Sequence, residues 1–442
     1  MSKKVLILGA GLVSQPIIDY LFEKTDHTLT VADIVKENAQ KAINGNPRGR
    51  AENLDVQDET ALRALITDSD LVVSLLPYVL HSLVAKHCLA ANKSMVNASY
   101  VSEEMQAFDS EAREKGLLFL CEMGLDPGID HMSAVKIIDE AQENGGKITE
   151  FLSVCGGLPA PDSNNNPFGY KFSWSPKGVL LAGNNPARYI ENGVDKVISA
   201  EKLFHSTRAM EIAGKEFEAY PNRDSVPYKE IYGLDGIKLL MRGTLRYSGW
   251  HKLILALKAL HLIEPLPVEA GVQSFAELIA KLNDLPQSSL RESVAAKLGV
   301  SMDAAEMEAF AWLGLFSEEQ RTVEDTTVLD LVAEVMNEKM SYEDGERDMV
   351  VLQHQFTIEY ADHIDKVTST LIDYGSPDGD SSMARTVSSP LAIAVRLILN
   401  GEIELTGVQI PVHKCIYEPV LKELETLGIA FDEEHVRVEH NN

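Results

Sequence analysis

The sequence contains few cysteines, and none of them are close together. Its four cysteines, Cys88, Cys121, Cys155 and Cys415, lie far apart and form no CxxC pair. This spacing argues against both a structural zinc site and a disulfide framework. A reducing, cytoplasmic location is therefore expected.

Long apolar runs and an excess of basic residues are also missing. No stretch approaches the roughly 20 apolar residues that cross a bilayer, and the run Val5–Leu8 leads directly into glycines rather than into a signal-peptide core. A formal net charge of −27 would repel nucleic acid and anionic membranes. The expected partner is a small-molecule substrate, with no nucleic acid and no membrane.

The composition is that of a globular protein with a packed core. Of its 442 residues, 45% are apolar and 24% are charged. At about 150 residues per domain, this length predicts two or three domains.

Short apolar runs alternate with helical patterns through the first third of the chain. This alternation predicts an α/β fold with a Rossmann-type doubly wound parallel sheet, in a dinucleotide-binding domain over residues 1–125. The expected strands are Val5–Leu8, Leu29–Val31, Ala51–Leu54, Leu71–Leu76, Met95–Ala98 and Leu117–Cys121.

A different pattern follows. Residues 126–250 and 345–389 are rich in turn residues and include strand-like pieces at Phe151–Cys155 and Met349–Tyr360, which predicts a second α/β domain with a mixed sheet.

Helical periodicity dominates residues 251–344 and predicts a helical domain inserted into the second one. The tail, residues 390–442, is expected to form two helices. Its pattern leaves open whether they pack back on the first domain.

The loop Gly9-Ala10-Gly11-Leu12-Val13-Ser14 follows the first strand and opens a helix. Gly9 suits a tight turn, and Gly11 lets the backbone approach a pyrophosphate at the helix N-terminus. Ser14 replaces the usual third Gly or Ala but is still small. A turn without a ligand is the alternative, yet the position at the start of the alternation favours dinucleotide binding, with Leu12 and Val13 as further contacts.

Asp33 ends the second expected strand, where a carboxylate accepts hydrogen bonds from ribose hydroxyls and repels a 2′-phosphate. NAD is therefore favoured, with NADP possible because Lys36 is close by. A turn aspartate without a ligand is the alternative.

Ligands of open parallel sheets bind beyond the carboxyl ends of the strands. Asp126, which precedes Pro127, is expected to cap the helix that contains His131, with free amides after it that could hold an anion or the nicotinamide carboxamide. Further cofactor contacts are expected at Asp55, Val56, Leu76, Pro77, Ala98, Ser99 and Leu125.

Several motifs, in order along most of the chain, resemble the glutamate-forming saccharopine dehydrogenase family. They are NASYVS (97–102), GLDPGIDH (124–131), CGGLPAP (155–161), NPFGYKFSWSP (166–176), YPNRDS (220–225), GTLRY (243–247) and GERDMVVLQH (345–354). The resemblance implies a Rossmann domain, a saccharopine-binding domain, a helical domain and a role in lysine metabolism. The implied reaction converts saccharopine, NAD(P)+ and water to glutamate, 2-aminoadipate 6-semialdehyde and NAD(P)H. Fungal members that use NADP have Arg after the second strand, whereas this chain has Asp33-Ile34, which puts NADP in doubt.

The resemblance also implies which residues contact the substrate. Saccharopine has three carboxylates, which suit the forked guanidinium groups of Arg223 and Arg246. Arginines in surface ion pairs are the alternative. The implied substrate contacts are Ser99, Tyr100, Asp126, Arg223, Thr244, Leu245 and Arg246.

The reaction must deprotonate a secondary amine, for which Asp126 is the first candidate, Tyr100 the second and Cys155 the third. Chemistry without an essential side chain is also open. His81, His87 and His131 are given no role, and no metal is expected.

Two other functions fit parts of the pattern. One is a related imine-reducing enzyme such as carboxynorspermidine synthase, and the other is a catalytically silent NAD(H) sensor. The sequence leaves open the physiological direction and the oligomeric state, for which a homodimer is one option.

Overall fold

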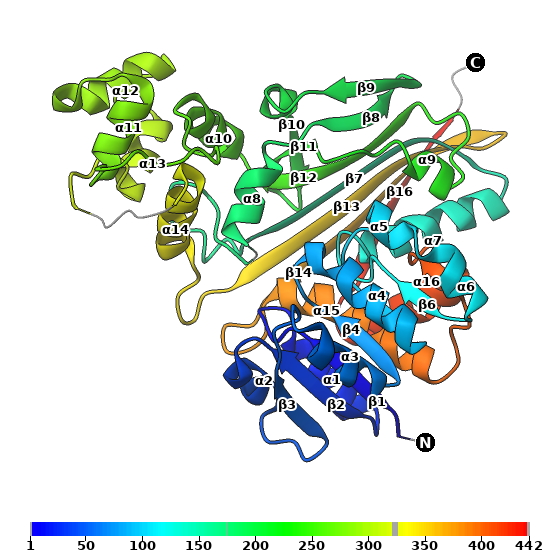
Figure 1. Cartoon of the computed structure of the whole chain (residues 1–442). Helices are drawn as coiled ribbons and strands as arrows, with labels where there is room; N and C mark the ends of the chain where they lie inside the picture. The colour runs from blue at the N-terminus through cyan, green and yellow to red at the C-terminus, as the bar shows by residue number, and fades with distance from the viewer. Residues whose placement is uncertain (1, 174, 321–325, 440–442) are drawn as a thin grey trace. The chain divides into compact units, whose positions relative to one another are not determined.

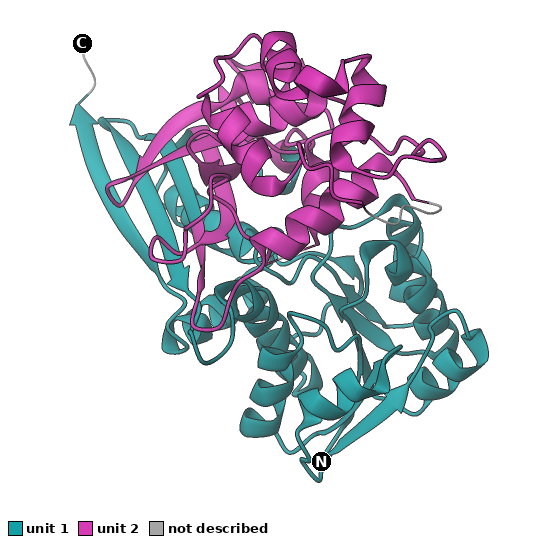
Figure 2. Cartoon of the chain, turned by 90° about the vertical axis from the view of Figure 1, so that its left-hand side faces the viewer, with its two compact units in different colours: residues 1–149, 230–234, 352–442 teal, residues 150–229, 235–351 magenta. Residues whose placement is uncertain are grey.

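The computed structural model describes residues 2–173, 175–320 and 326–439. The chain forms two compact units (Figure 2). Unit 1 comprises Met1–Thr149, Glu230–Leu234 and Leu352–Asn442, and unit 2 comprises Glu150–Lys229 and Asp235–Val351. The sequence predicts three regions with other limits, and those limits stay predictions.

Unit 1 contains a parallel sheet with the order β3-β2-β1-β4-β5-β6-β15 (Figure 1). Its strands are β1 (Lys4–Leu8), β2 (Thr28–Asp33), β3 (Gly49–Asn53), β4 (Leu71–Ser74), β5 (Ser94–Asn97), β6 (Leu118–Leu120) and β15 (Gly407–Gln409). The strand order reverses between β1 and β4, which is where such sheets bind dinucleotides. The predicted Rossmann-type sheet is confirmed, and β15 from the C-terminal tail lies beside β6.

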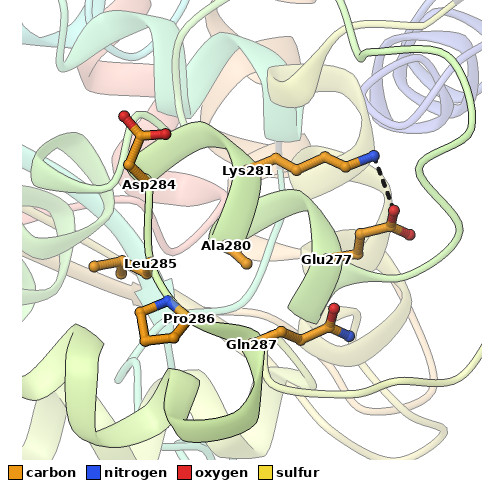
Figure 3. Close-up of a pocket in the computed structure, with 7 residues that line it drawn as sticks. All are labelled: Glu277, Ala280, Lys281, Asp284, Leu285, Pro286 and Gln287. Atoms are coloured by element: carbon orange, nitrogen blue, oxygen red, sulfur yellow. Dashed lines mark ion pairs between the residues drawn. The ribbon is translucent and has the colours of Figure 1, made fainter.

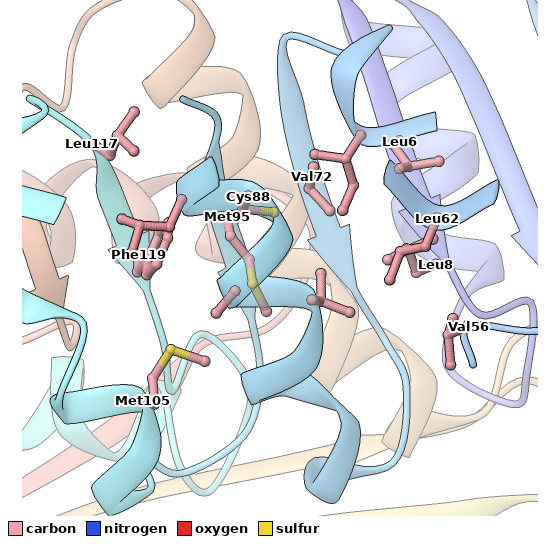
Figure 4. Close-up of a cluster of buried hydrophobic side chains, with 14 of the residues drawn as sticks. Leu6, Leu8, Val56, Leu62, Val72, Cys88, Met95, Met105, Leu117 and Phe119 are labelled. Atoms are coloured by element: carbon pink, nitrogen blue, oxygen red, sulfur yellow. The ribbon is translucent and has the colours of Figure 1, made fainter. Parts of the chain in front are cut away.

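The sheet is buried by apolar residues from its strands and the neighbouring helices (Figure 4). Leu6, Leu8, Val72, Met95 and Phe119 are each at most 1% exposed. Parallel strands are covered on both faces, so their sequences are nearly continuous apolar runs. This is why β1, β4, β5 and β6 could be found from their apolar runs, whereas the edge strand β3 has no buried residue.

Helix α15 (Ser382–Leu399) contacts α1 (Gln15–Lys24), and the Ser388 hydroxyl donates to the Val13 carbonyl. Of the described helices, only α15 is long and apolar enough to cross a membrane, but 72% of it is buried, as in a core helix. The other helices of unit 1 are α2 (Lys36–Ile43), α3 (Glu59–Thr67), η1 (Tyr78–Leu80), α4 (His81–Ala91), α5 (Glu103–Gln106), α6 (Asp109–Glu114), α7 (Ile129–Glu143) and α16 (Lys414–Thr426).

A second sheet mixes parallel and antiparallel pairs, which confirms the predicted mixed sheet. In unit 2, β12 (Leu239–Tyr247) runs parallel to β7 (Lys147–Pro159) and antiparallel to β11 (Lys215–Pro221) and β8 (Ala187–Glu191). In unit 1, β14 (His363–Tyr374) pairs with β16 (Phe431–Glu439). The remaining strands are β9 (Val194–Ile198), β10 (Arg208–Ile212) and β13 (Asp348–Glu359).

The helices of residues 251–344 fall where helical periodicity is strongest. They are α10 (Trp250–Ala259), α11 (Phe275–Asn283), η3 (Gln287–Ser289), α12 (Leu290–Leu298), α13 (Ala305–Leu313) and α14 (Val328–Met340). Earlier in the chain lie α8 (Pro176–Ala182), η2 (Leu203–Ser206) and α9 (Tyr228–Ile231).

Candidate active site

The glycine loop between β1 and α1 has the geometry of a pyrophosphate site. Gly9 has φ +100°, and a Cβ there would lie 3.1 Å from the Leu75 carbonyl oxygen, so only glycine fits easily. In the described part of the chain, the amides of Leu12 and Val13 have no acceptor, and the space beside Gly11 is open. Ser14 is buried, and its hydroxyl donates to the Gly11 carbonyl at 2.8 Å. Free amides at a helix start suit an anionic phosphate.

Asp33 lies at the end of β2, beside this loop. Its Oδ2 accepts from the Ala10 amide at 2.8 Å, and its Oδ1 accepts from the Val35 amide at 2.8 Å. Leu12 and Ile34 are exposed by 77% and 67%. A fixed carboxylate at the end of β2, with exposed apolar side chains in the adjoining segments, fits the ribose and the flat adenine of a dinucleotide.

The other predicted cofactor contacts differ in exposure. Asp55 is exposed, and its Oδ1 accepts from the Gln57 amide at 2.9 Å, whereas Val56 belongs to the core. After β4, Leu76 is half-buried and Pro77 exposed. Ala98, which is half-buried, and Leu125, which is buried, follow β5 and β6.

A hydrogen-bonded histidine, which the sequence analysis gave no role, lies between the ends of β4 and β5. His81 Nδ1 is 2.9 Å from Ser74 Oγ, and its Nε2 is 2.8 Å from Ser99 Oγ. Burial lowers the pKa of His81 to about 4, so the ring is neutral near pH 7. The sequence signal for this pair was a serine within the expected strand Leu71–Leu76 and a histidine five residues after that strand.

Tyr100 and Asp126, the two preferred acid-base candidates, are brought together. The Tyr100 hydroxyl donates to Asp126 Oδ1 at 2.8 Å, and both side chains are half-buried. A carboxylate that accepts a phenol and still contacts solvent is placed to exchange a proton with a ligand.

The predicted capping role of Asp126 is wrong. Helix α7 begins at Ile129 with Gly128 as its N-cap, and the Gly128 amide donates to Asp130 Oδ1 at 2.7 Å. The amides of Ile129 and Asp130 donate to the carbonyls of Gly124 and Leu125, at 2.8 and 3.0 Å. These three amides are therefore engaged within the chain rather than free for an anion or a carboxamide.

A buried hydrogen-bond network joins the segment that contains Tyr100 to the segment that contains Asp126. His131 is 0% exposed, and its Nε2 lies 2.7 Å from Glu122 Oε2, while its Nδ1 contacts the Tyr232 hydroxyl. Glu122 Oε1 also accepts from the Val101 amide at 3.0 Å. The network links the segment that contains Tyr100 to the one that contains Asp126, so His131 is a structural neighbour of both candidates.

The predicted substrate arginines lie in unit 2. Arg246 is only 8% exposed, and its guanidinium lies over the rings of Tyr170 and Trp250, with 4.9 and 5.7 Å to the centroids. Its Nη1 donates to the Leu245 carbonyl, and its Nε has no partner among the described residues. No described carboxylate forms an ion pair with it. A buried cation in this state suits an anionic ligand.

The other candidate residues of unit 2 are either more exposed than Arg246 or lie on strands β7 and β12. Arg223 is exposed and has φ +54°, an uncommon conformation for a residue other than glycine. Thr244 is half-buried and Leu245 fully buried on β12, where Thr244 pairs with Cys155 of β7. Cys155 is itself buried.

A surface pocket elsewhere in unit 2 contains none of these candidates (Figure 3). Its lining includes Lys281 and Glu277, which form an ion pair at 2.9 Å. Its other lining residues are Ala280, Asp284, Leu285, Pro286 and Gln287. Within the described ranges, no three His, Cys, Asp or Glu side chains are grouped to hold a metal ion.

Comparisons with known proteins agree with these features. Residues 5–120 match the saccharopine dehydrogenase NADP binding domain, and residues 124–429 match the saccharopine dehydrogenase C-terminal domain. The chain is 41% identical to saccharopine dehydrogenase [NADP(+), L-glutamate-forming] of Saccharomyces cerevisiae, over 99% of this chain and 100% of that protein. It is 40% identical to the mitochondrial alpha-aminoadipic semialdehyde synthase of Bos taurus, over 97% of this chain and 47% of that one.

The structural comparison points the same way. The apo saccharopine dehydrogenase (L-Glu forming) of Saccharomyces cerevisiae superposes with a TM-score of 0.90 at 40% identity, covering 98% of this chain and 100% of that one. The family predicted from the motifs is confirmed, rather than the carboxynorspermidine synthase alternative, while the preference for NAD is not. With both domain models matched and a full-length relative above 40% identity, the chain belongs to the saccharopine dehydrogenase family.

Proposed function

We propose that this protein oxidises saccharopine to glutamate and 2-aminoadipate 6-semialdehyde with a nicotinamide dinucleotide. The main supporting observation is the Tyr100–Asp126 pair, at 2.8 Å, beyond the carboxyl ends of β5 and β6 in the dinucleotide-binding sheet. The names of the yeast relatives support the same substrate and products.

In this proposal Asp126 accepts the proton of the substrate's secondary amine, and the Tyr100 hydroxyl holds the carboxylate in place. The bound cofactor supplies a hydride acceptor. Water then adds to the resulting C=N bond, and Asp126 returns the proton to the nitrogen as the C–N bond breaks and glutamate leaves. Arg246 and Arg223 hold substrate carboxylates, with Thr244, Leu245 and Ser99 as further contacts.

For the cofactor, we propose NAD in preference to NADP. Both oxygens of the Asp33 carboxylate are already fixed by backbone amides, so the side chain cannot easily turn away from a 2′-phosphate. The yeast relative's name specifies NADP(+), so the preference is a specific feature proposed for this chain. Replacing Asp33 with Ser should lower kcat/KM with NAD and raise it with NADP. An unmodified enzyme that prefers NADP would contradict this part of the proposal alone.

The reaction itself is tested by mixing purified protein, saccharopine and either cofactor, then following reduced cofactor and free glutamate. Equal amounts of both products are expected. Binding of NADH without turnover of saccharopine would favour the silent sensor. A cytoplasmic location and a homodimer stay predictions, and one relative is named as mitochondrial.

A further inference from the structure

His81 is the first residue of α4 and is 5% exposed. It bridges two serine hydroxyls, with Nδ1 2.9 Å from Ser74 Oγ and Nε2 2.8 Å from Ser99 Oγ. The Ser99 backbone is fixed separately, because its amide donates to Asn97 Oδ1 at 2.9 Å and its carbonyl accepts from the Glu122 amide at 3.1 Å. What His81 controls is therefore the Ser99 hydroxyl, not the course of the chain.

The surroundings of Ser74 determine which ring nitrogen has the proton. A neutral imidazole has one N–H donor and one acceptor nitrogen. Ser74 is 1% exposed, and in the described chain its hydroxyl has no partner other than Nδ1. If Nδ1 were the donor, the Ser74 hydroxyl hydrogen would be buried without an acceptor, which is costly. Ser74 therefore donates to Nδ1, and Nε2–H donates to Ser99 Oγ.

This assignment leaves the Ser99 hydroxyl hydrogen free. Ser99 is half-buried, two residues beyond the end of β5, and no described group other than His81 Nε2 hydrogen-bonds to its Oγ. With Nε2–H as donor, the serine oxygen accepts one hydrogen bond, and its O–H has no acceptor among the described residues. The matching ligand group is an acceptor oxygen.

We propose that His81 is a positioning residue, which holds Ser99 as a hydrogen-bond donor to a ligand oxygen. The oxygen is a carboxylate oxygen of the substrate or the carboxamide oxygen of the nicotinamide. The identity of the ligand rests on the proposed function. The direction of the hydrogen bond between His81 and Ser99 does not depend on it.

Two substitutions of His81 distinguish the contribution of Nε2 from that of Nδ1. His81→Gln keeps a polar group near the Nε2 position beside Ser99, whereas His81→Asn keeps one only near the Nδ1 position beside Ser74. His81→Asn should lower kcat/KM about ten- to a hundredfold, and His81→Gln should restore most of it. A rise in KM for saccharopine identifies the substrate carboxylate, and weaker NADH binding measured by fluorescence identifies the carboxamide.

The loss should disappear when Ser99 is already Ala, because the hydroxyl that His81 positions is then absent. Equal losses in His81→Asn and His81→Gln, or an undiminished loss in the Ser99→Ala background, would overturn the proposal. His87→Asn, also buried in α4 but without contact to Ser99, is the matched control and should leave kcat/KM within about twofold.

If His81→Asn does not fold, Ser74→Ala tests the same chain of hydrogen bonds, because it removes the hydroxyl that donates to His81 Nδ1. It should lower kcat/KM in the native background and not in Ser99→Ala. The tautomer is also measurable without turnover, by the nitrogen shifts of His81 in an NMR spectrum, identified by difference from His81→Gln. A proton on Nδ1 would contradict the positioning role of His81. A protein that has the proton on Nε2 but does not turn over saccharopine would contradict only the proposed reaction.

Discussion

At the residue scale, the structure distinguishes side chains that the sequence could only nominate. Asp126 was selected from its motif, but the role of helix cap that local chemistry suggested belongs to Gly128. The Asp126 carboxylate is instead bound by Tyr100, 26 positions away. The rule that ligands bind beyond the carboxyl ends of parallel strands brings both segments to one edge of the sheet, but no periodicity or spacing predicts this particular hydrogen bond.

The Tyr100–Asp126 pair leads to a prediction about the rate of the reaction. Asp126→Asn should lower kcat about 10²- to 10⁴-fold, because an amide cannot take the amine proton. Tyr100→Phe should have a smaller effect, since it removes only a hydrogen bond to the base. Steady-state kinetics with saturating saccharopine and cofactor will measure both. A kcat for Asp126→Asn within about threefold of the unmodified enzyme would show that another group or water moves the proton.

Arg246 leads to a prediction about substrate affinity. Arg246→Ala should raise KM for saccharopine about a hundredfold, with little change in KM for the cofactor, because it removes a buried cation that forms no ion pair with a described carboxylate. Arg246→Lys should recover little, since an ammonium lacks the planar fork that lies over Tyr170 and Trp250. Arg208→Ala is the control, as Arg208 is half-buried and pairs with Glu191 at 2.6 Å. An equal rise in KM for saccharopine in Arg246→Ala and Arg208→Ala would indicate a general structural effect.

At the element scale, regular periodicity was predictable and short or connecting pieces were not. Strands β1, β4, β5 and β6 are the apolar runs that a buried parallel sheet requires, and they lie where the sequence placed them. The edge strand β3 (GRAEN) has no buried residue and begins two residues before its expected start at Ala51. By contrast, β15 has three residues, and β16 is exposed over nearly all of its length. Neither has an apolar pattern that distinguishes it from a loop, because its pairing depends on a strand far away in the chain.

The turn before α7 leads to a prediction about stability. Gly128 has φ +147°, and a Cβ there would lie 2.0 Å from the Gly124 carbonyl oxygen. Gly128→Ala should therefore lower the free energy of unfolding by at least about 1–3 kcal/mol and reduce kcat through displacement of Asp126. Gly145→Ala is a suitable comparison, because Gly145 also has a positive φ of +78° but lies beside open space. Urea unfolding of both variants will measure the difference, and equal losses would contradict a steric origin.

At the scale of the whole molecule, the charge of −27 must coexist with groups that bind an anionic substrate and an anionic cofactor. Local groups provide the solution: the free amides of Leu12 and Val13 in unit 1, and the buried guanidinium of Arg246 in unit 2. Composition gives only the net charge, whereas the three-dimensional structure shows where groups that can bind anions lie within an acidic chain.

The same charge predicts how salt affects stability. Like charges spread over the surface repel one another in the folded state, and salt shortens the reach of that repulsion from about 30 Å at 0.01 M to about 3 Å at 1 M. Many ion pairs of the described chain are exposed, such as Lys4–Asp68 and Lys177–Asp330, and each of these contributes at most about 1 kcal/mol. Screening the repulsion should therefore outweigh the loss of these pairs. Differential scanning calorimetry should show Tm rising by a few degrees with sodium chloride, whereas a falling Tm would mean that paired charges dominate over the net charge.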